Sequence, residues 1–174
     1  ADILAVKDEF GISLFDLNGV FKNKFQLISR FPETMLFMGK EIYTTTYNAA
    51  KPDLIQVYSR QGEALRSFQI KKLLYPIRYD IHKGLSPDQL ERIVFEGLLR
   101  SDEQSIYFLS KRFGNVLCYG PDGNRTGDWE LSEILGDNEK AKAERNRKMF
   151  LEEGYDLEKN ERMIPHNYLF EDAH

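Results

Sequence analysis

Residues 12–19 read Ile-Ser-Leu-Phe-Asp-Leu-Asn-Gly, and this arrangement returns twice further along the chain. Residues 55–62 read Ile-Gln-Val-Tyr-Ser-Arg-Gln-Gly, and residues 116–123 read Val-Leu-Cys-Tyr-Gly-Pro-Asp-Gly. When the three copies are aligned on their final glycines, apolar residues recur seven, five and four positions before the glycine and six and eight positions after it. Self-similarity in a fixed register is typical of a repeat protein. In order, these positions hold Ile12, Ile55 and Val116; Leu14, Val57 and Cys118; Phe15, Tyr58 and Tyr119; Phe25, Phe68 and Trp129; and Leu27, Ile70 and Leu131.

Each copy predicts a β-hairpin. The apolar positions on either side of the glycine are spaced by two, which is typical of a strand with one buried face. Between them lies a short polar loop, residues 16–19, 59–62 or 120–123, that ends in glycine. Glycine accepts the positive φ that tight hairpin turns require.

Further strands are predicted before each hairpin. Residues 2–6, 41–46 and 105–109 are rich in β-branched and aromatic side chains, as strands are. Two units also have a candidate for a fourth, innermost strand, at residues 34–38 and 92–98. The first unit lacks this strand, because residue 1 falls directly before its second strand.

Four consecutive antiparallel strands at a spacing of about forty residues predict the blade of a β-propeller. The spacing is 43 residues from Gly19 to Gly62 and 61 residues from Gly62 to Gly123. The longer interval predicts an insertion at residues 71–91, in which residues 86–90 open one helical turn.

The three units resemble the blades of NHL-type and related bacterial six-bladed β-propellers. In that family an apolar strand ends in an aromatic residue, a turn of the form D/N/S-x-x-G follows, and the outer strand contains Phe. The resemblance covers residues 2–131 and implies a mainly β chain, a partial β-propeller of about three four-stranded antiparallel blades. Residues 132–174 are predicted to form a helical segment followed by a possible returning strand. The chain departs from the family in having three blades where the family closes a ring of six.

Two explanations of the missing half remain open. The chain is an excerpt of a longer propeller, or two copies form one six-bladed ring. In the second case the strand predicted at residues 167–172 completes the first blade beside residues 3–6. Either way a bare three-blade arc would expose sheet edges and apolar faces, so a protein partner or a homodimer is expected.

The tail is predicted to be helical. Ser132 caps a short turn, and Asp137 or Asn138 caps a helix over residues 139–153, which ends at Gly154. Its first two turns are almost entirely charged residues and alanine, and residues 149–151 give it an apolar end.

Length and composition fit one soluble domain with a real core, because the chain has 174 residues and ordinary apolar and charged fractions. A net charge of −4 disfavours a nucleic-acid partner, which needs a basic face. No apolar run is long enough for a transmembrane helix. The single cysteine, Cys118, occupies a repeat core position and is interpreted as a buried hydrophobe. A mature secreted chain would also lack a signal peptide, so the compartment stays open.

One stretch imitates a calcium loop. Residues 122–133 carry oxygen-bearing side chains at the spacing of an EF-hand loop, with Gly127 at its sixth position. Against this, Trp129 stands where small aliphatic residues are usual, and the repeat places this segment in a strand. The candidate metal ligands are Asp122, Asn124, Thr126, Asp128 and Glu133.

No catalytic motif emerges, because the three histidines are scattered and neither a Gly-x-Ser-x-Gly motif nor a P-loop is present. The first hypothesis is a noncatalytic binding or assembly module with a rigid propeller surface. The alternative is a propeller hydrolase or lyase that uses carboxylates, and a divalent cation, at the central channel. Candidates for residues facing that channel are Glu33, Met35, Glu96 and Arg100.

Overall fold

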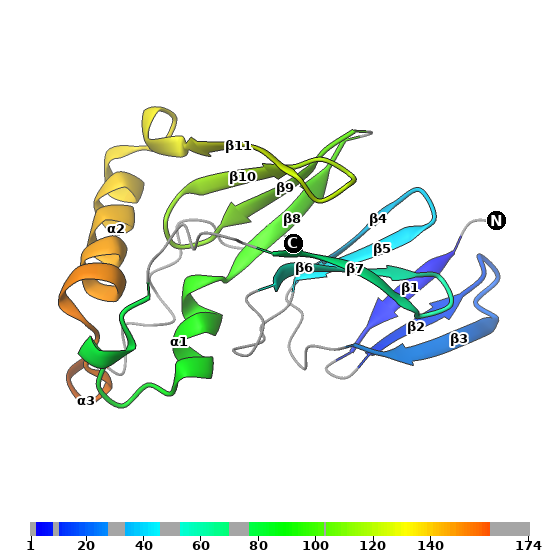
Figure 1. The fold of residues 1–174 in the computed structure, drawn as a ribbon, viewed down its shortest axis with the longest axis horizontal. Helices are drawn as coiled ribbons and strands as arrows, with labels where there is room; N and C mark the ends of the chain where they lie inside the picture. Colours follow the sequence, from blue (N-terminus) through cyan, green and yellow to red (C-terminus); the bar gives the residue numbers. More distant parts are fainter. Residues whose placement is uncertain are drawn as a thin grey trace. The chain divides into compact units, whose positions relative to one another are not determined.

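The computed structural model describes residues 3–8, 11–27, 34–45, 53–69, 77–102 and 104–160. The chain is mainly β, with three antiparallel sheets of three, four and four strands and a helical segment after them (Figure 1). It divides into two compact units, Ala1–Gln69 and Ile70–His174, which are described separately. The predicted fold class is confirmed.

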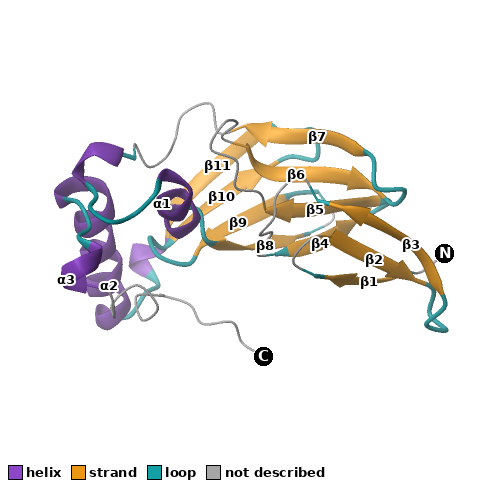
Figure 2. Cartoon of the chain, turned by 90° about the horizontal axis from the view of Figure 1, so that it is seen from below, coloured by secondary structure: helices purple, strands orange, loops and turns teal. Residues whose placement is uncertain are grey.

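The first unit contains two sheets whose strands follow one another in chain order (Figure 2). The first sheet comprises β1 (Leu4–Lys7), β2 (Gly11–Phe15) and β3 (Phe21–Gln26). The second sheet comprises β4 (Met35–Met38), β5 (Glu41–Thr45), β6 (Asp53–Ser59) and β7 (Ala64–Gln69). Their shared core contains Ile12, Leu14 and Leu27 of the first sheet and its loop, and Ile42 and Tyr58 of the second.

The second unit contains the third sheet and the helices. The sheet comprises β8 (Gly97–Ser101), β9 (Ile106–Ser110), β10 (Asn115–Tyr119) and β11 (Arg125–Glu130). The short helix η1 (Tyr79–Ile81) and α1 (Pro87–Val94) precede it. The elements after it are η2 (Leu131–Glu133), α2 (Asp137–Arg147), the π-helical η3 (Lys148–Glu153) and α3 (Leu157–Asn160).

The repeat predicted from sequence holds at the level of strand register. The residue seven positions before the glycine faces the residue six positions after it in all three hairpins: Ile12 and Phe25, Ile55 and Phe68, Val116 and Trp129. The register of each hairpin also shifts at the same place, between the residues five and four positions before the glycine. Three hairpins therefore share one backbone plan.

The turns share that plan as well. The glycines have φ values of 78°, 90° and 82° at Gly19, Gly62 and Gly123. Each glycine amide donates to the carbonyl oxygen three residues earlier, at 2.9, 3.0 and 2.9 Å respectively. In the first two turns a side-chain oxygen, from Asp16 or Ser59, also accepts hydrogen bonds from two backbone amides of the turn.

Burial follows the repeat with one correction. Tyr58, Phe68 and Tyr119 are buried as expected, while Phe15 and Phe25 are half-buried. Trp129 is 51% exposed, against expectation. Its ring lies over Gly127, where an added Cβ would come within 3.1 Å of the indole, and beside Tyr107 at 6.5 Å between ring centroids.

The innermost strand predicted at residues 92–98 is present as β8, but its predicted start is wrong, because α1 continues through Val94 and the strand begins at Gly97. The helix is held by a capping box, in which the Gln89 amide donates to the Ser86 hydroxyl at 3.3 Å and the Ser86 amide donates to the Gln89 side chain at 2.8 Å. It then buries Leu90, Ile93 and Val94 at helical spacing. An apolar run that alternates weakly thus forms a helix because a strong N-terminal cap precedes it.

The other predicted elements are placed as follows. The innermost strand at 34–38 is confirmed as β4, and the tail helix is confirmed as α2 followed by η3. Its N-cap is Gly136 rather than Asp137 or Asn138. The strand predicted at 167–172 lies outside the described residues, and the division of the chain at residue 131 stays a prediction.

Replacing Phe68 with Ala should lower the free energy of unfolding by about 3–5 kcal/mol, because it empties a fully buried aromatic site. Urea unfolding followed by circular dichroism measures this. Leu65→Ala, on the same strand but 45% exposed, is the matched control and should change the free energy by about 0.5 kcal/mol or less. Equal effects of the two substitutions would contradict the repeat core.

Candidate functional site

The first sheet has one covered face and one uncovered face. Its covered face presents Ile12 and Leu14 to the second sheet. The opposite face carries a cross-strand row, Leu4 beside Phe15 beside Phe21, and Val6 lies two residues from Leu4 on the same side. Leu4 is 54% exposed and Phe21 is 56% exposed. Leu4, Val6, Phe15 and Phe21 together are called the Leu4 face below.

The repeat shows what this face corresponds to in the second sheet. There the equivalent row is Ile42, Tyr58 and Ala64, on β5, β6 and β7. Ile42 is 0% exposed and Tyr58 is 2% exposed, because the first sheet packs against them. The same structural position is therefore covered on the second sheet and uncovered on the first.

The third sheet also has an exposed row of apolar side chains, but on the other face, the one that corresponds to the Ile12 and Phe25 face of the first sheet. Leu98, Leu109, Val116 and Trp129 lie beside one another across all four strands. The first three are half-buried and Trp129 is exposed. These four residues, called the Trp129 face below, include the counterparts of Ile12 and Phe25, which in the first unit lie toward the second sheet.

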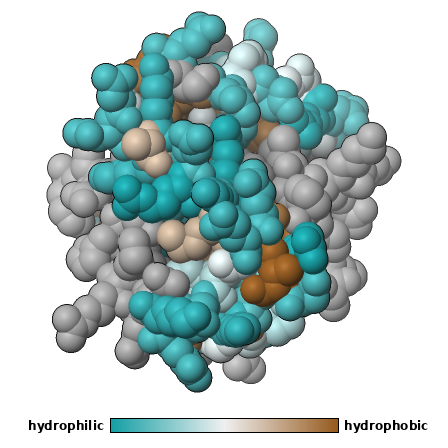
Figure 3. All heavy atoms as spheres, turned by 90° about the vertical axis from the view of Figure 1, so that its left-hand side faces the viewer, coloured by the Kyte–Doolittle hydropathy of each residue, from teal (hydrophilic) through white to brown (hydrophobic). Residues whose placement is uncertain are grey.

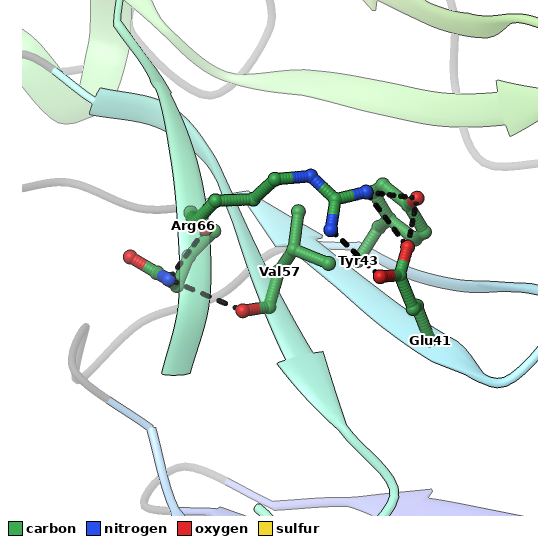
Figure 4. Close-up of polar contacts among 5 residues, drawn as sticks. Glu41, Tyr43, Val57 and Arg66 are labelled. Carbon is green, nitrogen blue, oxygen red and sulfur yellow. Dashed lines mark hydrogen bonds and ion pairs between the residues drawn. The ribbon is translucent and has the colours of Figure 1, made fainter. Parts of the chain in front are cut away.

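A polar cluster lies across β5 and β7 of the second sheet (Figure 4). Arg66 binds Glu41 through both guanidinium Nη atoms, at 2.6 and 2.7 Å, and also donates to the Tyr43 hydroxyl at 3.0 Å. The Tyr43 hydroxyl donates to Glu41 Oε2 at 2.6 Å. Val57 lies between Tyr43 and Arg66 in the strand register, so the cluster spans three strands.

The electrostatics of this cluster favour fixed charges. The hydrogen bond from Arg66 lowers the pKa of Glu41, and burial, followed by the contact with Glu41, raises the pKa of Tyr43 to about 12. At neutral pH Glu41 is therefore ionised and Tyr43 stays protonated as a hydrogen-bond donor. The cluster is suited to hold strands together rather than to transfer protons.

Glu41→Gln should lower the free energy of unfolding by about 1–3 kcal/mol at pH 7, because it removes a charge-assisted, bidentate contact. Glu41 has a lowered pKa in the folded chain, so its contribution is present above its ordinary pKa of 4.5 and is lost as the pH falls through the folded value. Unfolding measured between pH 7 and pH 3 should show the difference between parent and variant shrinking below pH 4.5. The exposed Glu63→Gln is the control, and a difference independent of pH would contradict this role.

The predicted calcium ligands are spread along the hairpin of β10 and β11. Asp122 lies in the turn, and its carboxylate accepts hydrogen bonds from the Asn124 backbone amide at 3.1 Å and from Asn124 Nδ2 at 2.5 Å. Asp128 is paired with Arg125 on the same strand. Thr126 is exposed on β11, and Glu133 is exposed in η2.

We expect calcium titrated into the protein to give no saturable heat. A strand stands where a calcium loop would enter its second helix, and Asp128 is already ion-paired with Arg125. Within the described ranges, no group of three His, Cys, Asp or Glu side chains is arranged to hold a metal ion. Isothermal titration calorimetry checks this. A saturable heat that disappears in Asp122→Ala would restore the calcium loop.

The candidate channel residues fall on both units, Met35 on the first and Glu96 and Arg100 on the second, and their grouping at one channel stays a prediction. Met35 packs against the core of the first unit. Glu96 forms an ion pair with Arg112 at 3.0 Å. Arg100 Nη1 donates a hydrogen bond to the neighbouring Leu99 carbonyl at 2.8 Å. Glu33 lies outside the described residues.

A cavity of roughly 270 Å³ lies in the second unit. Arg112 is 1% exposed there, with its guanidinium 5.9 Å from the centre of the Phe150 ring. The Lys111 amide donates to the Glu96 carbonyl at 3.0 Å, so the Glu96–Arg112 pair joins the β9–β10 turn to the end of α1. This pair is better explained as a structural link than as a binding group. The cavity is lined by Leu85, Gln89, Arg92, Ile93, Glu96, Arg112 and Leu157.

The helical side of the second unit is mostly hydrophilic (Figure 3). Nearby, burial lowers the pKa of His82, and its Nδ1 accepts a hydrogen bond from the Tyr155 amide at 3.0 Å. No helix in the described parts of the chain is both long and apolar enough to span a membrane.

Comparison with known proteins adds a limited likeness of fold. Neither a family model nor a curated protein matches the sequence. Among solved structures, selenomethionine-substituted virginiamycin B lyase from Staphylococcus aureus is similar with a TM-score of 0.45 and 13% identity, over 70% of this chain and 34% of that one. A catalytically inactive variant of that lyase, solved with Quinupristin, gives the same values. HIRA(644-1017) is similar with a TM-score of 0.40 and 14% identity, over 72% of this chain and 36% of that one. The chain thus spans about a third of the length of the solved chains it matches.

Sequence reasoning placed the repeat and predicted exposed apolar faces, but it did not name their residues and it missed the Glu41–Tyr43–Arg66 cluster. The signal for the Leu4 face was present, because Leu4 and Val6 alternate on a predicted strand. The cluster could have been found once Tyr43 and Arg66 were placed opposite Val57 in the hairpin register. Neither could be recognised without knowing which face of each sheet is covered.

Proposed function

We propose that this chain is a noncatalytic assembly module that receives a further β-sheet on its Leu4 face. One observation supports this most directly. The equivalent row on the second sheet, which includes Ile42 and Tyr58, is buried by a neighbouring sheet, while Leu4 and Phe21 are more than half exposed. A protein partner, a second copy included, supplies the missing cover.

Burying this face contributes a favourable free energy to association. Burying an exposed Leu, Val or Phe side chain contributes about 1.5–3 kcal/mol when it is complete. Leu4, Val6 and Phe21 are each about half exposed, so their full burial contributes several kcal/mol before the cost of association.

The chemistry of the surface favours a protein over a nucleic acid. The row across the Leu4 face is apolar, and the whole chain has a net charge of −4. A polyanion binds through clustered basic residues. We therefore expect no nucleic-acid partner. The NHL-type resemblance and the hydrolase or lyase alternative stay predictions, and no contact among the described residues favours the enzyme.

The test places a photoreactive phenylalanine analogue at position 21 of the full-length protein in its own cells. We expect efficient cross-links from this position to a β-rich polypeptide, identified by mass spectrometry. The same analogue at Glu144, an exposed position on the charged helix α2, is the control and should cross-link at least several-fold less. Equal yields at both positions would mean that the Leu4 face stays open to water, and the proposal would be wrong.

A further inference from the structure

We infer that the sheet covering the Leu4 face is the third sheet of a second copy, applied through its Trp129 face. This inference rests on the proposed function and names the partner. It follows from the contact that the first two sheets already make within one chain, which supplies a residue-by-residue template.

The template has two parts. Phe25 of the first sheet lies against the Tyr58 ring of the second, with 5.6 Å between ring centroids. Phe25 also lies over Gly62, where an added Cβ would come within 2.4 Å of the Phe25 side chain. One sheet thus offers an aromatic side chain six positions after its glycine, and the next sheet offers an aromatic residue and a bare turn glycine.

Each half of this contact recurs alone among the described residues. Trp129 is the counterpart of Phe25 and is exposed. Phe15 and Gly19 are the counterparts of Tyr58 and Gly62, and an added Cβ at Gly19 would meet no atom within 4 Å. The template therefore places Trp129 of one copy against Phe15 and over Gly19 of the other.

The two uncovered faces are of complementary kinds, which favours a second copy over other occupants. Each chain carries one face of each kind, and in the dimer that we propose each copy contributes one face to each of the two contacts. The pairing of residues 167–172 beside β1 is a separate prediction, which lies outside the described residues.

The contact is tested by cross-linking between copies. In a Cys118→Ala background, chains carrying Phe15→Cys are mixed with chains carrying Trp129→Cys and treated with a short bismaleimide. We expect covalent dimers in the mixture at a yield at least about ten-fold above either chain alone. Phe15→Cys mixed with Glu144→Cys is the matched control and should stay uncoupled. A yield no higher in the mixture than in the control would overturn the inference.

A second measurement does not depend on cysteine variants folding normally. Sedimentation velocity of the unmodified protein should give twice the chain mass at micromolar concentration, and Trp129→Lys should give the mass of a single chain. Ile134→Lys, at a position that is 78% exposed and lies outside both faces, should keep the doubled mass. A single-chain mass for the unmodified protein, or a doubled mass that Trp129→Lys leaves intact, would overturn the inference.

The outcomes separate the two proposals. Photo-cross-links from position 21 to a different protein or to another segment of the same polypeptide would keep the assembly module and overturn the second copy. Absence of cross-links from position 21 would overturn both.

Discussion

The contact between Phe25 and the pair formed by Tyr58 and Gly62 is the interaction on which the first unit depends. A twisted four-stranded sheet buries only one face against a single neighbour, so its stability requires that successive sheets present matching surfaces. Here the match is an aromatic ring that enters the space left by a glycine without a side chain. Gly62 is held at a φ of 90° by its turn, so this position favours glycine for two independent reasons.

The sequence predicted the features that depend on local residues and missed those that depend on contacts with other segments. The hairpins were predicted well, because their register, bulge and turn are all local consequences of alternation around a glycine. The start of the strand at residues 92–98 was predicted wrongly, because the apolar residues there satisfy helical as well as strand spacing and the Ser86–Gln89 capping box decides between them. The exposure of Trp129 could not be predicted, since the repeat fixes the position of the side chain and not whether another sheet covers it.

The candidate metal ligands stay a prediction, and the polar cluster of the second sheet was missed because it depends on strand pairing. The spacing of Asp122, Asn124 and Asp128 imitates a calcium loop, but Asp122 and Asn124 precede β11 in the hairpin turn, while Asp128 lies on the strand β11. The Glu41–Tyr43–Arg66 cluster brings together residues 25 positions apart, and only the pairing of β5, β6 and β7 makes them neighbours. Among the described residues several ion pairs thus link strands and turns, while the exposed faces of the first and third sheets carry apolar side chains.

The central claim is that Trp129 is exposed in a single chain and covered in the assembly. Trp129 is the only tryptophan in the sequence, so intrinsic fluorescence reports on it alone. The account predicts a blue-shifted emission and weak quenching by acrylamide at micromolar concentration, with a red shift and stronger quenching as dilution separates the copies. Emission typical of a solvent-exposed indole at every concentration, up to the highest attainable, would contradict it.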